Sequence, residues 1–402
     1  MISYYWPPCG GPGSLRPVKF AKYLPDFGIE PIILTRKNIA YHTLDTDLKH
    51  EIRSVQTIET ESLDPARLLY RFGMRRYKPR VWQRPIKQGL NFPDHKLPWF
   101  PFAVQAGRKI VFDSIYVTAP PFSAFLIAHA LAYAGNKPLI LDFRDSWLKF
   151  PFMPYKGLLQ RSLVRLLEDK ITHAAQGIIT VDDNIKYDLV QRYPDISARV
   201  TVIPNGYDPD DFTRVERPGI FTLTYLGTVR AERNPEPVLR AAEKAINTNK
   251  IDKMHVNFIG HIEEPYPKLL KKYPFVHIHG HIPYRRALQE FARSHGGLMI
   301  TTGSTFFFPS RQNEYLASGL PIVVCGRSRG MHMLEKAFQQ GYPGWVYEYN
   351  DINGMAKRIG ELYRAYKNGT LIQGQTPYTH YTRKNLTRQL ADIMKKTLNT
   401  NI

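Results

Sequence analysis

The chain has 402 residues, and 55 Lys and Arg against 35 Asp and Glu give a formal net charge of +20. A hydrophobic content of 43% with 12% aromatics excludes a disordered chain, and the length indicates two or three domains at about 150 residues each. The two cysteines, Cys9 and Cys325, exclude a disulfide framework and a cysteine metal site, so we expect a reducing, cytosolic compartment.

The longest stretch without a charged side chain, residues 114–136, does not predict a transmembrane helix. Pro120 and Pro121 interrupt it, which indicates a buried strand, a turn and a helix instead. The first residues lack the basic and apolar segments of a signal peptide, so we expect no secretion.

Apolar runs alternate with helical patterns through the first half of the chain, as in stacked βαβ units. A strand at Ile2–Trp6, a glycine-rich turn at Pro7–Gly13 and a helix capped near Ser14 and ended by Gly28 form the first unit. The further predicted strands are Pro31–Thr35, Ser114–Thr118, Pro138–Asp142, Gly177–Val181 and Val200–Ile203. We expect them to form one open sheet.

A cluster of turn-forming residues, Pro204–Phe212, marks a break in the pattern. The strands predicted after it are Phe221–Leu226, His255–Ile259, Val276–His279, Gly297–Ile300 and Pro321–Val324. The sequence therefore predicts an α/β protein with two Rossmann-like domains, residues 1–205 and 206–380, and a C-terminal helix in 381–402 that packs back on the first domain. Ligands of such sheets bind at the carboxyl ends of the strands, so we expect a central cleft there.

The segment Arg311–Val324 contains the most informative pattern. A helix from Arg311 to Ser318 would place Glu314 in its first turn, where a carboxylate accepts hydrogen bonds from two neighbouring ribose hydroxyls and the backbone amides suit a phosphate. The alternative is that Glu314 is an acidic residue favoured at any helix N-terminus.

The segment Tyr225–Asn234 follows the first strand of the second domain. Gly227 allows close approach to the backbone, and Arg230 and Arg233 could hold a diphosphate, although two loop arginines are more often solvated surface charge. The glycine-rich turn Pro7–Ser14 departs from the G-x-G-x-x-G dinucleotide fingerprint, which makes an oxidoreductase a poor interpretation.

Together these segments resemble the family 4 glycosyltransferases of the GT-B fold. The matching features cover most of the chain and are the Pro-Pro-x-Gly-Gly-x-Gly turn, Asp142–Trp147, Val202–Asp208, Gly227–Asn234 and Glu314–Pro321. The resemblance implies a nucleotide-sugar donor, linked to UDP or GDP, held mainly by the second domain, and it implies no cofactor.

The resemblance also assigns roles residue by residue. Arg233 falls where the family has a lysine that contacts the donor phosphates, and Glu314 falls on the glutamate that binds the ribose. Three positions depart from the family pattern: Phe306 replaces the first glutamate of the pair, Thr228 replaces an arginine whose role Arg230 could take, and Thr118 replaces a histidine. The predicted donor-binding residues are Gly11, Gly13, Gly227, Arg230, Arg233, Asn313, Glu314, Tyr315 and Leu316.

The same family transfers sugars with retention of configuration, usually by a front-face displacement in which the leaving diphosphate accepts the proton. The predicted catalytic residues are Arg230 and Arg233, which stabilise the diphosphate, and Asp142 and Asp145 as candidate bases. Arg144, Asp145 and Trp147 are the predicted acceptor-binding residues. The alternative is that Asp145 caps a helix and pairs with Arg144.

Metal-binding patterns are weak. Asp45-x-Asp47 and Asp208-x-Asp210 have the spacing of a cation-binding pair but lie in predicted loops, and His277, His279 and His281 lack an acidic partner. We expect transfer without a metal ion.

Positive charge concentrates between residues 64 and 109, where eleven basic side chains face two acidic ones among Trp82, Phe92, Trp99, Phe100 and Phe102. This combination suits an anionic membrane, and Trp147–Leu167 could add an apolar contact. The alternative is a solvated basic face whose aromatic side chains turn to the core. The membrane interpretation implies a lipid-linked acceptor and a place on the inner face of the bacterial cytoplasmic membrane.

The sequence thus predicts a hexosyltransferase that builds a bacterial surface polysaccharide. A non-catalytic nucleotide-sugar-binding relative is one alternative, because Phe306 and Thr228 replace polar residues. A basic nucleic-acid-binding protein is the other, although no nucleic-acid-binding signature is present and we expect no nucleic acid partner.

Overall fold

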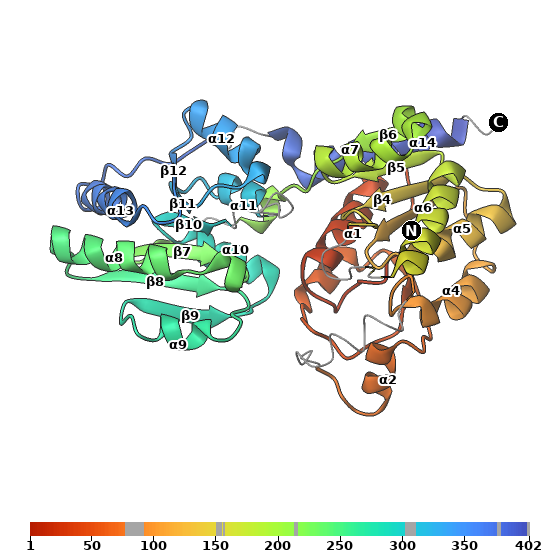
Figure 1. The fold of residues 1–402 in the computed structure, drawn as a ribbon, viewed down its shortest axis with the longest axis horizontal. Helices are drawn as coiled ribbons and strands as arrows, with labels where there is room; N and C mark the ends of the chain where they lie inside the picture. Colours follow the sequence, from red (N-terminus) through yellow and green to blue (C-terminus); the bar gives the residue numbers. More distant parts are fainter. Residues whose placement is uncertain are drawn as a thin grey trace. The chain divides into compact units, whose positions relative to one another are not determined.

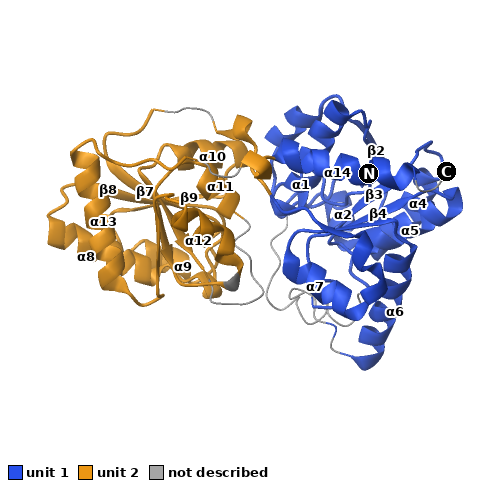
Figure 2. Cartoon of the chain, turned by 90° about the horizontal axis from the view of Figure 1, so that it is seen from above, with its two compact units in different colours: residues 1–205, 383–402 blue, residues 206–382 orange. Residues whose placement is uncertain are grey.

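Two α/β units, each with its own parallel sheet, make up the chain. Residues 1–205 with 383–402 form unit 1, and residues 206–382 form unit 2 (Figure 2). The computed structural model describes residues 1–76, 92–149, 155, 157–212, 216–301, 311–375 and 379–399.

Unit 1 begins and ends with helices that pack on each other. Its elements in chain order are α1 (Pro12–Tyr23), η1 (Leu24–Phe27), β1 (Ile32–Arg36), η2 (Asp47–Ile52), β2 (Gln56–Thr60), α2 (Pro65–Arg71), η3 (Leu97–Trp99), α4 (Phe100–Gly107), β3 (Ile115–Ala119), α5 (Ser123–Gly135), β4 (Leu139–Phe143), α6 (Leu158–Ala174), β5 (Gly177–Thr180), α7 (Asp183–Arg192), η4 (Pro194–Arg199), β6 (Val200–Val202) and α14 (Arg383–Asn399) (Figure 1).

Ile2 joins the strands of unit 1 into one sheet. Strands β1 and β2 form one parallel pair, and β3, β4, β5 and β6 form a parallel row of four. The Ile2 amide donates to the Tyr116 carbonyl (2.8 Å), the Thr118 amide donates to the Ile2 carbonyl (3.3 Å), and Ile2 also bridges to Leu34 of β1. The predicted strand Ile2–Trp6 is therefore reduced to this bridge, while the predicted single sheet is confirmed. Strand β2 escaped prediction because only its last residue is buried.

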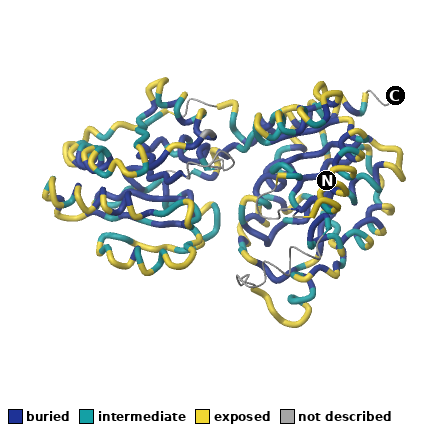
Figure 3. The backbone as a smooth tube through the Cα atoms, in the orientation of Figure 1, coloured by how far each residue is buried: buried dark blue, intermediate teal, exposed yellow. Residues whose placement is uncertain are grey.

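The helix predicted to start near Ser14 starts at Pro12, because Gly11, with a φ of 91°, occupies the N-cap position. Gly28 ends the following turn in the left-handed conformation, as predicted. Strands β3 and β4 are buried at every residue, which explains their continuous apolar sequences (Figure 3).

A buried ion pair ties α1 to β4 inside unit 1. The guanidinium of Arg16 makes two hydrogen bonds of 2.9 Å to the two carboxylate oxygens of Asp142, and the Tyr116 hydroxyl donates to the same carboxylate at 2.5 Å. The side chains of Arg16 and Asp142 are 1% and 0% exposed. Arg16 also donates to the Ile203 and Pro204 carbonyls, so it connects β4 with the end of the sheet.

The elements of unit 2 follow one another as βα pairs. They are η5 (Pro209–Asp211), β7 (Phe221–Leu226), η6 (Ala231–Arg233), α8 (Glu236–Asn249), β8 (Met254–Ile259), α9 (Tyr266–Leu270), β9 (Val276–Gly280), α10 (Tyr284–Ala292), β10 (Gly296–Ile300), α11 (Gln312–Ala317), β11 (Ile322–Cys325), η7 (Arg329–Met331), α12 (His332–Gln339), β12 (Gly344–Tyr347), α13 (Ile352–Lys367) and η8 (Thr379–Tyr381).

The sheet of unit 2 is parallel, with the strand order β12-β11-β10-β7-β8-β9. Alternate strand residues bury against different helices: Leu298 belongs to a core shared with α8 and α13, and Met299 belongs to one shared with α10, α11 and α12. Helices therefore cover both faces of this sheet. Strand β12, half-buried along its length, was not predicted.

The C-terminal helix α14 packs within unit 1. Ile393 lies against Gly177 of β5, Arg388 lies over the Phe27 ring at 5.6 Å, and Lys384 pairs with Asp26 at 2.7 Å. Among the helices that the structure describes, none combines the length and the apolar character needed to cross a bilayer.

Replacing Arg16 with methionine should destabilise unit 1 by about 3–5 kcal/mol, because it leaves the Asp142 carboxylate buried without its cation. Four of the five tryptophans lie in residues 1–205, so tryptophan fluorescence during urea denaturation follows mainly this unit. An Arg16→Met/Asp142→Leu variant should recover part of the loss, since no charge is stranded. A loss equal to the sum of the two single changes would contradict the buried pair.

Candidate functional site

The strand order of unit 2 identifies the place where a ligand is expected. The order reverses between β7 and β10, which lie side by side. In open α/β sheets, ligands bind outside the carboxyl ends of the strands at such a switch point. Leu226 ends β7 and Ile300 ends β10, so the loop that starts at Gly227 lies at this point.

Backbone hydrogen bonds order the loop after β7. The Gly227 amide donates to Ile259 (2.9 Å) and the Val229 amide donates to His261 (2.9 Å). The loop approaches Gly260 so closely that a Cβ on Gly260 would lie 2.0 Å from the Gly227 oxygen. A Cβ on Gly227 would lie 3.0 Å from the Tyr225 hydroxyl, so a glycine at this position allows the close packing of the loop on Tyr225. Contact between Gly227 and the donor stays a prediction.

Three arginines gather around Tyr225 at the end of β7. Burial raises the pKa of Tyr225, and the positive charges of Arg233, Arg230 and Arg311 act in the opposite direction. Arg233 Nε and Arg311 Nη1 are buried and have no hydrogen-bond partner among the described residues. Buried donors are normally paired, so this cluster of positive charge suits an anionic ligand that accepts several hydrogen bonds.

Arg311 was not among the predicted site residues. The sequence places it directly before α11, and an arginine at a helix start carries no signal of its own because positive charge is unfavourable there. Its guanidinium lies over the ring of Tyr284, the first residue of α10, at 5.8 Å from the ring centre. Helix α10 therefore helps to position the charged group of Arg311. Only the packing of α10 against α11 reveals this arrangement.

Glu314 is 3% exposed and keeps one oxygen without a partner. Its Oε1 accepts a hydrogen bond from the Tyr284 hydroxyl at 3.1 Å, whereas no described residue donates to its buried Oε2. Leaving a buried carboxylate oxygen unpaired costs free energy, which a ligand hydroxyl would recover. The ribose role of Glu314 stays a prediction, and this geometry fits it. Helix α11 has six residues, fewer than the predicted Arg311–Ser318.

The neighbours of Glu314 have structural roles. The Tyr315 hydroxyl accepts from the Leu226 amide (2.8 Å) and donates to the Leu298 carbonyl (2.5 Å) in the core, and Leu316 is 2% exposed. These two side chains belong to the core, and donor binding by Tyr315 and Leu316 stays a prediction. Asn313 is 5% exposed beside them. Phe306 lies outside the described residues.

In unit 1, Asp142 has no free capacity for catalysis. Its carboxylate is fully buried and is occupied by Arg16 and Tyr116. The prediction of Asp142 as a base is corrected, because the residue serves as the partner of a core cation. Thr118 is likewise buried, at 1% exposure.

Arg144 holds the glycine-rich turn against the end of β3. Its guanidinium donates to the carbonyls of Gly13 (2.8 Å), Ala119 (3.3 Å) and Pro120. Gly13 fits because a Cβ there would lie 3.1 Å from the Tyr5 ring. These contacts give Arg144 a structural role, and acceptor binding by Arg144 and donor binding by Gly11 and Gly13 stay predictions.

Asp145 is half-buried and receives no hydrogen bond from the described part of the chain. Burial raises the pKa of its carboxyl to about 6, Arg144 lowers it and Asp182 raises it further. The alternative that Asp145 caps a helix does not hold for the described helices, since the next one in the chain, α6, has Gly157 at its N-cap position. A carboxyl with a pKa near 6 is suited to accept a proton near neutral pH.

Trp147 lies in the core of unit 1. It is 0% exposed, stacks on Phe122 at 5.0 Å and donates from Nε1 to the Tyr155 hydroxyl. The prediction that it binds the acceptor is wrong, because its apolar ring and its one donor are both satisfied internally.

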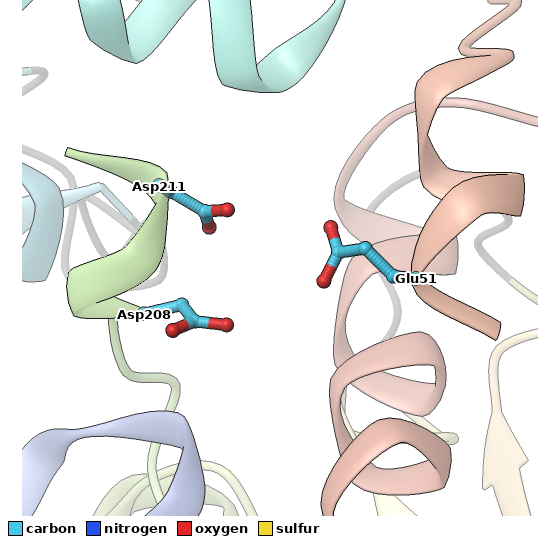
Figure 4. Close-up of side chains that lie close together, drawn as sticks. All are labelled: Glu51, Asp208 and Asp211. Atoms are coloured by element: carbon cyan, nitrogen blue, oxygen red, sulfur yellow. The ribbon is translucent and has the colours of Figure 1, made fainter. Parts of the chain in front are cut away.

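Both Asp-x-Asp motifs form local turns. Asp45 Oδ1 accepts from the Asp47 amide (3.1 Å), and Asp208 Oδ1 accepts from the Asp210 amide (3.2 Å). Asp208 caps η5 and Asp211 ends it, whereas Glu51 comes from η2 of unit 1 (Figure 4). The three carboxylates do not define a site within either unit.

The basic and aromatic segment 64–109 divides between core and surface. Trp99 is 0% exposed, Phe92 and Phe100 pack on the same core, and Lys96 is buried at 3.0 Å from Asp64. The prediction that these side chains face a membrane is wrong for them. Arg71, Arg75, Arg76, Arg108 and Lys109 are exposed, and Trp82 lies outside the described residues.

Comparison with known proteins finds a family model that matches part of the chain. Residues 18–211 match the model of Glycosyltransferase Family 4. None of the curated proteins compared with the chain matches it.

Solved structures share the fold at low identity. HepE of Anabaena, solved with UDP and glucose, is 11% identical at a TM-score of 0.62, covering 98% of both chains. A glycosyltransferase of Rickettsia africae is 12% identical at a TM-score of 0.60, over 95% of this chain and 93% of that one. The lipopolysaccharide outer core galactosyltransferase WaaB is 12% identical at a TM-score of 0.52, over 98% of both chains.

These likenesses extend over both α/β units. The chain therefore has the GT-B fold with two Rossmann-like domains, and its residues 18–211 are similar to Glycosyltransferase Family 4.

Proposed function

We propose that this protein transfers a hexose from a UDP- or GDP-linked sugar to a saccharide acceptor, with retention of configuration and without a metal ion. The observation that carries the proposal is the cluster in unit 2, where a buried nitrogen of Arg233, one of Arg311 and a buried oxygen of Glu314 have no hydrogen-bond partner among the described residues. Unpaired donors and an unpaired acceptor are complementary to a nucleoside diphosphate, which offers phosphate oxygens and ribose hydroxyls.

The donor end of the reaction belongs to unit 2 in this proposal. Arg230, Arg233 and Arg311 bind the diphosphate and stabilise the negative charge that grows on it as the sugar leaves. Glu314, held by the Tyr284 hydroxyl, accepts hydrogen bonds from the ribose. HepE, a structural neighbour, has been solved with UDP-glucose, which supports a nucleotide-sugar donor.

The acceptor end belongs to unit 1. The acceptor hydroxyl oxygen forms a bond to the anomeric carbon on the face from which the diphosphate departs, and the bond between that carbon and the diphosphate oxygen breaks. We assign the acceptor proton to the carboxylate of Asp145, which is half-buried and receives no hydrogen bond from the residues that the structure describes. No protein nucleophile is required.

The acceptor and the location complete the proposal. A lipid-linked glycan of a bacterial surface polysaccharide fits the neighbour WaaB, a lipopolysaccharide galactosyltransferase. The exposed arginines Arg71, Arg75 and Arg76, beside Phe72 at 85% exposure, suit the anionic inner face of the cytoplasmic membrane.

Binding of nucleoside diphosphates tests the donor site. We expect UDP or GDP, but not ADP, to raise the melting temperature by mass action, with and without EDTA. Arg311→Gln should weaken the affinity for that ligand about tenfold to a hundredfold, since a hydrogen bond to a charged group contributes about 1.5–3 kcal/mol.

The matched control is Arg240→Gln, an exposed arginine of α8 in the same unit, which should bind as the wild type does. No melting shift with any diphosphate would overturn the donor assignment. Binding without sugar transfer or donor hydrolysis would identify the non-catalytic relative instead.

Glu314→Gln should weaken binding of the nucleoside diphosphate by about 1–3 kcal/mol while the fold persists, because the amide replaces a charged acceptor. Isothermal titration calorimetry measures this loss. Glu264→Gln changes an exposed glutamate of unit 2 and should leave the affinity unchanged. Equal affinities for the two variants would exclude the ribose contact.

The transfer rate should fall as the pH drops below about 6, because the Asp145 carboxyl, with its pKa raised to about 6, is then protonated and cannot accept the proton. Asp145→Asn should remove this pH limb and reduce kcat by about 10²–10⁴-fold. The profile of kcat against pH checks both, with Asp183→Asn, an exposed acid at the start of α7, as the control. If the Asp145→Asn variant kept the same fall in rate below about pH 6, Asp145 would not be the base, and the leaving diphosphate would be assigned as the proton acceptor.

A further inference from the structure

Histidines gather on two neighbouring strands of unit 2. Five of the thirteen histidines of the chain lie between residues 255 and 281, and they are His255, His261, His277, His279 and His281. They belong to β8, to β9 and to the segments that follow these two strands. Strand β9 forms one edge of the sheet and β8 lies beside it. The proposed transfer reaction gives none of these histidines a role.

The register of the two strands brings histidines from both of them to one face of the sheet. Asn257 of β8 is paired with His277 of β9 in a parallel ladder, and paired residues of neighbouring strands point to the same face. His255 precedes Asn257 by two positions and therefore shares that face. His255 is half-buried, whereas His277 on the edge strand is exposed.

The rings of His255 and His277 are in contact across the two strands. Their centres are 4.2 Å apart and their planes are inclined by 59°. Two imidazoles that ligate one tetrahedral zinc ion have ring centres about 5 Å apart, because each bound nitrogen lies about 2.0–2.1 Å from the metal. A small side-chain rotation of the exposed His277 ring gives this spacing without a movement of the backbone.

The surroundings of His255 favour its neutral form. Burial lowers the pKa of its imidazole, and the charges of His277 and Lys253 lower the pKa further. A metal ion binds the neutral imidazole and competes with the proton for the same nitrogen. A lowered pKa therefore leaves His255 available to a metal ion at neutral pH. Lys253 is exposed, so water screens its repulsion of a cation.

His279 lies next to this pair at the end of β9. The ladder shifts its register between Phe258 and Ile259, so the strand pairing does not fix the direction of the His279 side chain. Its imidazole nevertheless interacts electrostatically with His277. His279 is therefore near enough to the pair to be a third ligand.

Helix α10 contributes charges of both signs beside His279. Burial lowers the pKa of His279, the carboxylate of Glu290 raises it, and the charges of His277 and Arg286 lower it. Glu290 also lies 3.8 Å from Arg293, in an ion pair whose side chains are 30% and 42% exposed. The carboxylate of Glu290 offsets part of the positive charge that surrounds the histidines.

We propose that His255 and His277 bind a divalent transition-metal ion across strands β8 and β9, with His279 as a third ligand and water at the open position. Imidazole nitrogen is a ligand for zinc, copper and nickel, whereas magnesium and calcium prefer oxygen. An ion held by both strands would fasten the edge strand β9 to the sheet. Strand β8 separates β9 from β7, whose end carries the donor cluster, so this ion takes no part in sugar transfer.

Calorimetric titration of the full chain with Zn²⁺, in the absence of nucleotide, tests the site. His255→Gln and His277→Gln should each weaken the affinity for Zn²⁺ at least about tenfold, because the loss of even an outer partner of a metal ligand costs about 10–100-fold. Zn²⁺ should also raise the melting temperature of the wild type by mass action, and less in either variant. Mg²⁺ at the same concentration should not displace Zn²⁺.

The matched control is His332→Gln, which changes an exposed histidine at the start of α12 in the same unit and should bind Zn²⁺ as the wild type does. Equal Zn²⁺ affinities in the control and the two variants would overturn the proposal. So would a loss in His277→Gln alone, because the ion would then not join the two strands. Binding of nucleoside diphosphates to the wild type in EDTA reports on the donor site, so failures of the two proposals are distinguishable.

Discussion

The Tyr315 hydroxyl connects the parts on which the donor site depends. It accepts from the last residue of β7 and donates to β10, so it joins the two strands between which the order of the sheet reverses. Because Tyr315 belongs to α11, the same contact fixes the helix that carries Glu314 and follows Arg311. One buried hydroxyl with both hydrogen bonds satisfied thus sets where an arginine and a carboxylate stand over the end of the sheet.

Burial separates the roles of neighbouring residues in unit 1. Asp142 and Asp145 are three positions apart, but the first is enclosed with Arg16, while the second is half-buried and has no hydrogen bond from the described part of the chain. A buried carboxylate needs a cation and hydrogen bonds to stay charged, which occupies the groups that catalysis would use. The guanidinium of Arg144 likewise donates its hydrogen bonds to three backbone carbonyls. Of this segment, Asp145 retains the freedom to exchange a proton.

The net charge of +20 is not one surface property. Arg16 and Lys96 neutralise carboxylates in the core of unit 1, and Arg230, Arg233 and Arg311 gather at the end of β7. Arg71, Arg75 and Arg76 are exposed beside Phe72. The same residue type therefore serves folding, anion binding and surface attraction, and its surroundings decide which, because the strength of a charge interaction depends on how much water remains around it.

The sequence by itself determined the fold class, the single sheet of unit 1 and the similarity to the family 4 glycosyltransferases. Apolar runs such as Ile115–Ala119 and Leu139–Phe143 predict buried parallel strands because every residue of the run is buried. The sequence did not predict strands β2 (Gln56–Thr60) and β12 (Gly344–Tyr347). Both are partly exposed strands at the end of a sheet, where the alternation of apolar and polar residues is weaker. Only the tertiary structure decided that Asp142 and Trp147 are core residues and that Arg311 joins Arg230 and Arg233. The physical reason is that burial and pairing arise between residues far apart in the chain, such as Arg16 and Asp142, and no local pattern records which partner each side chain meets.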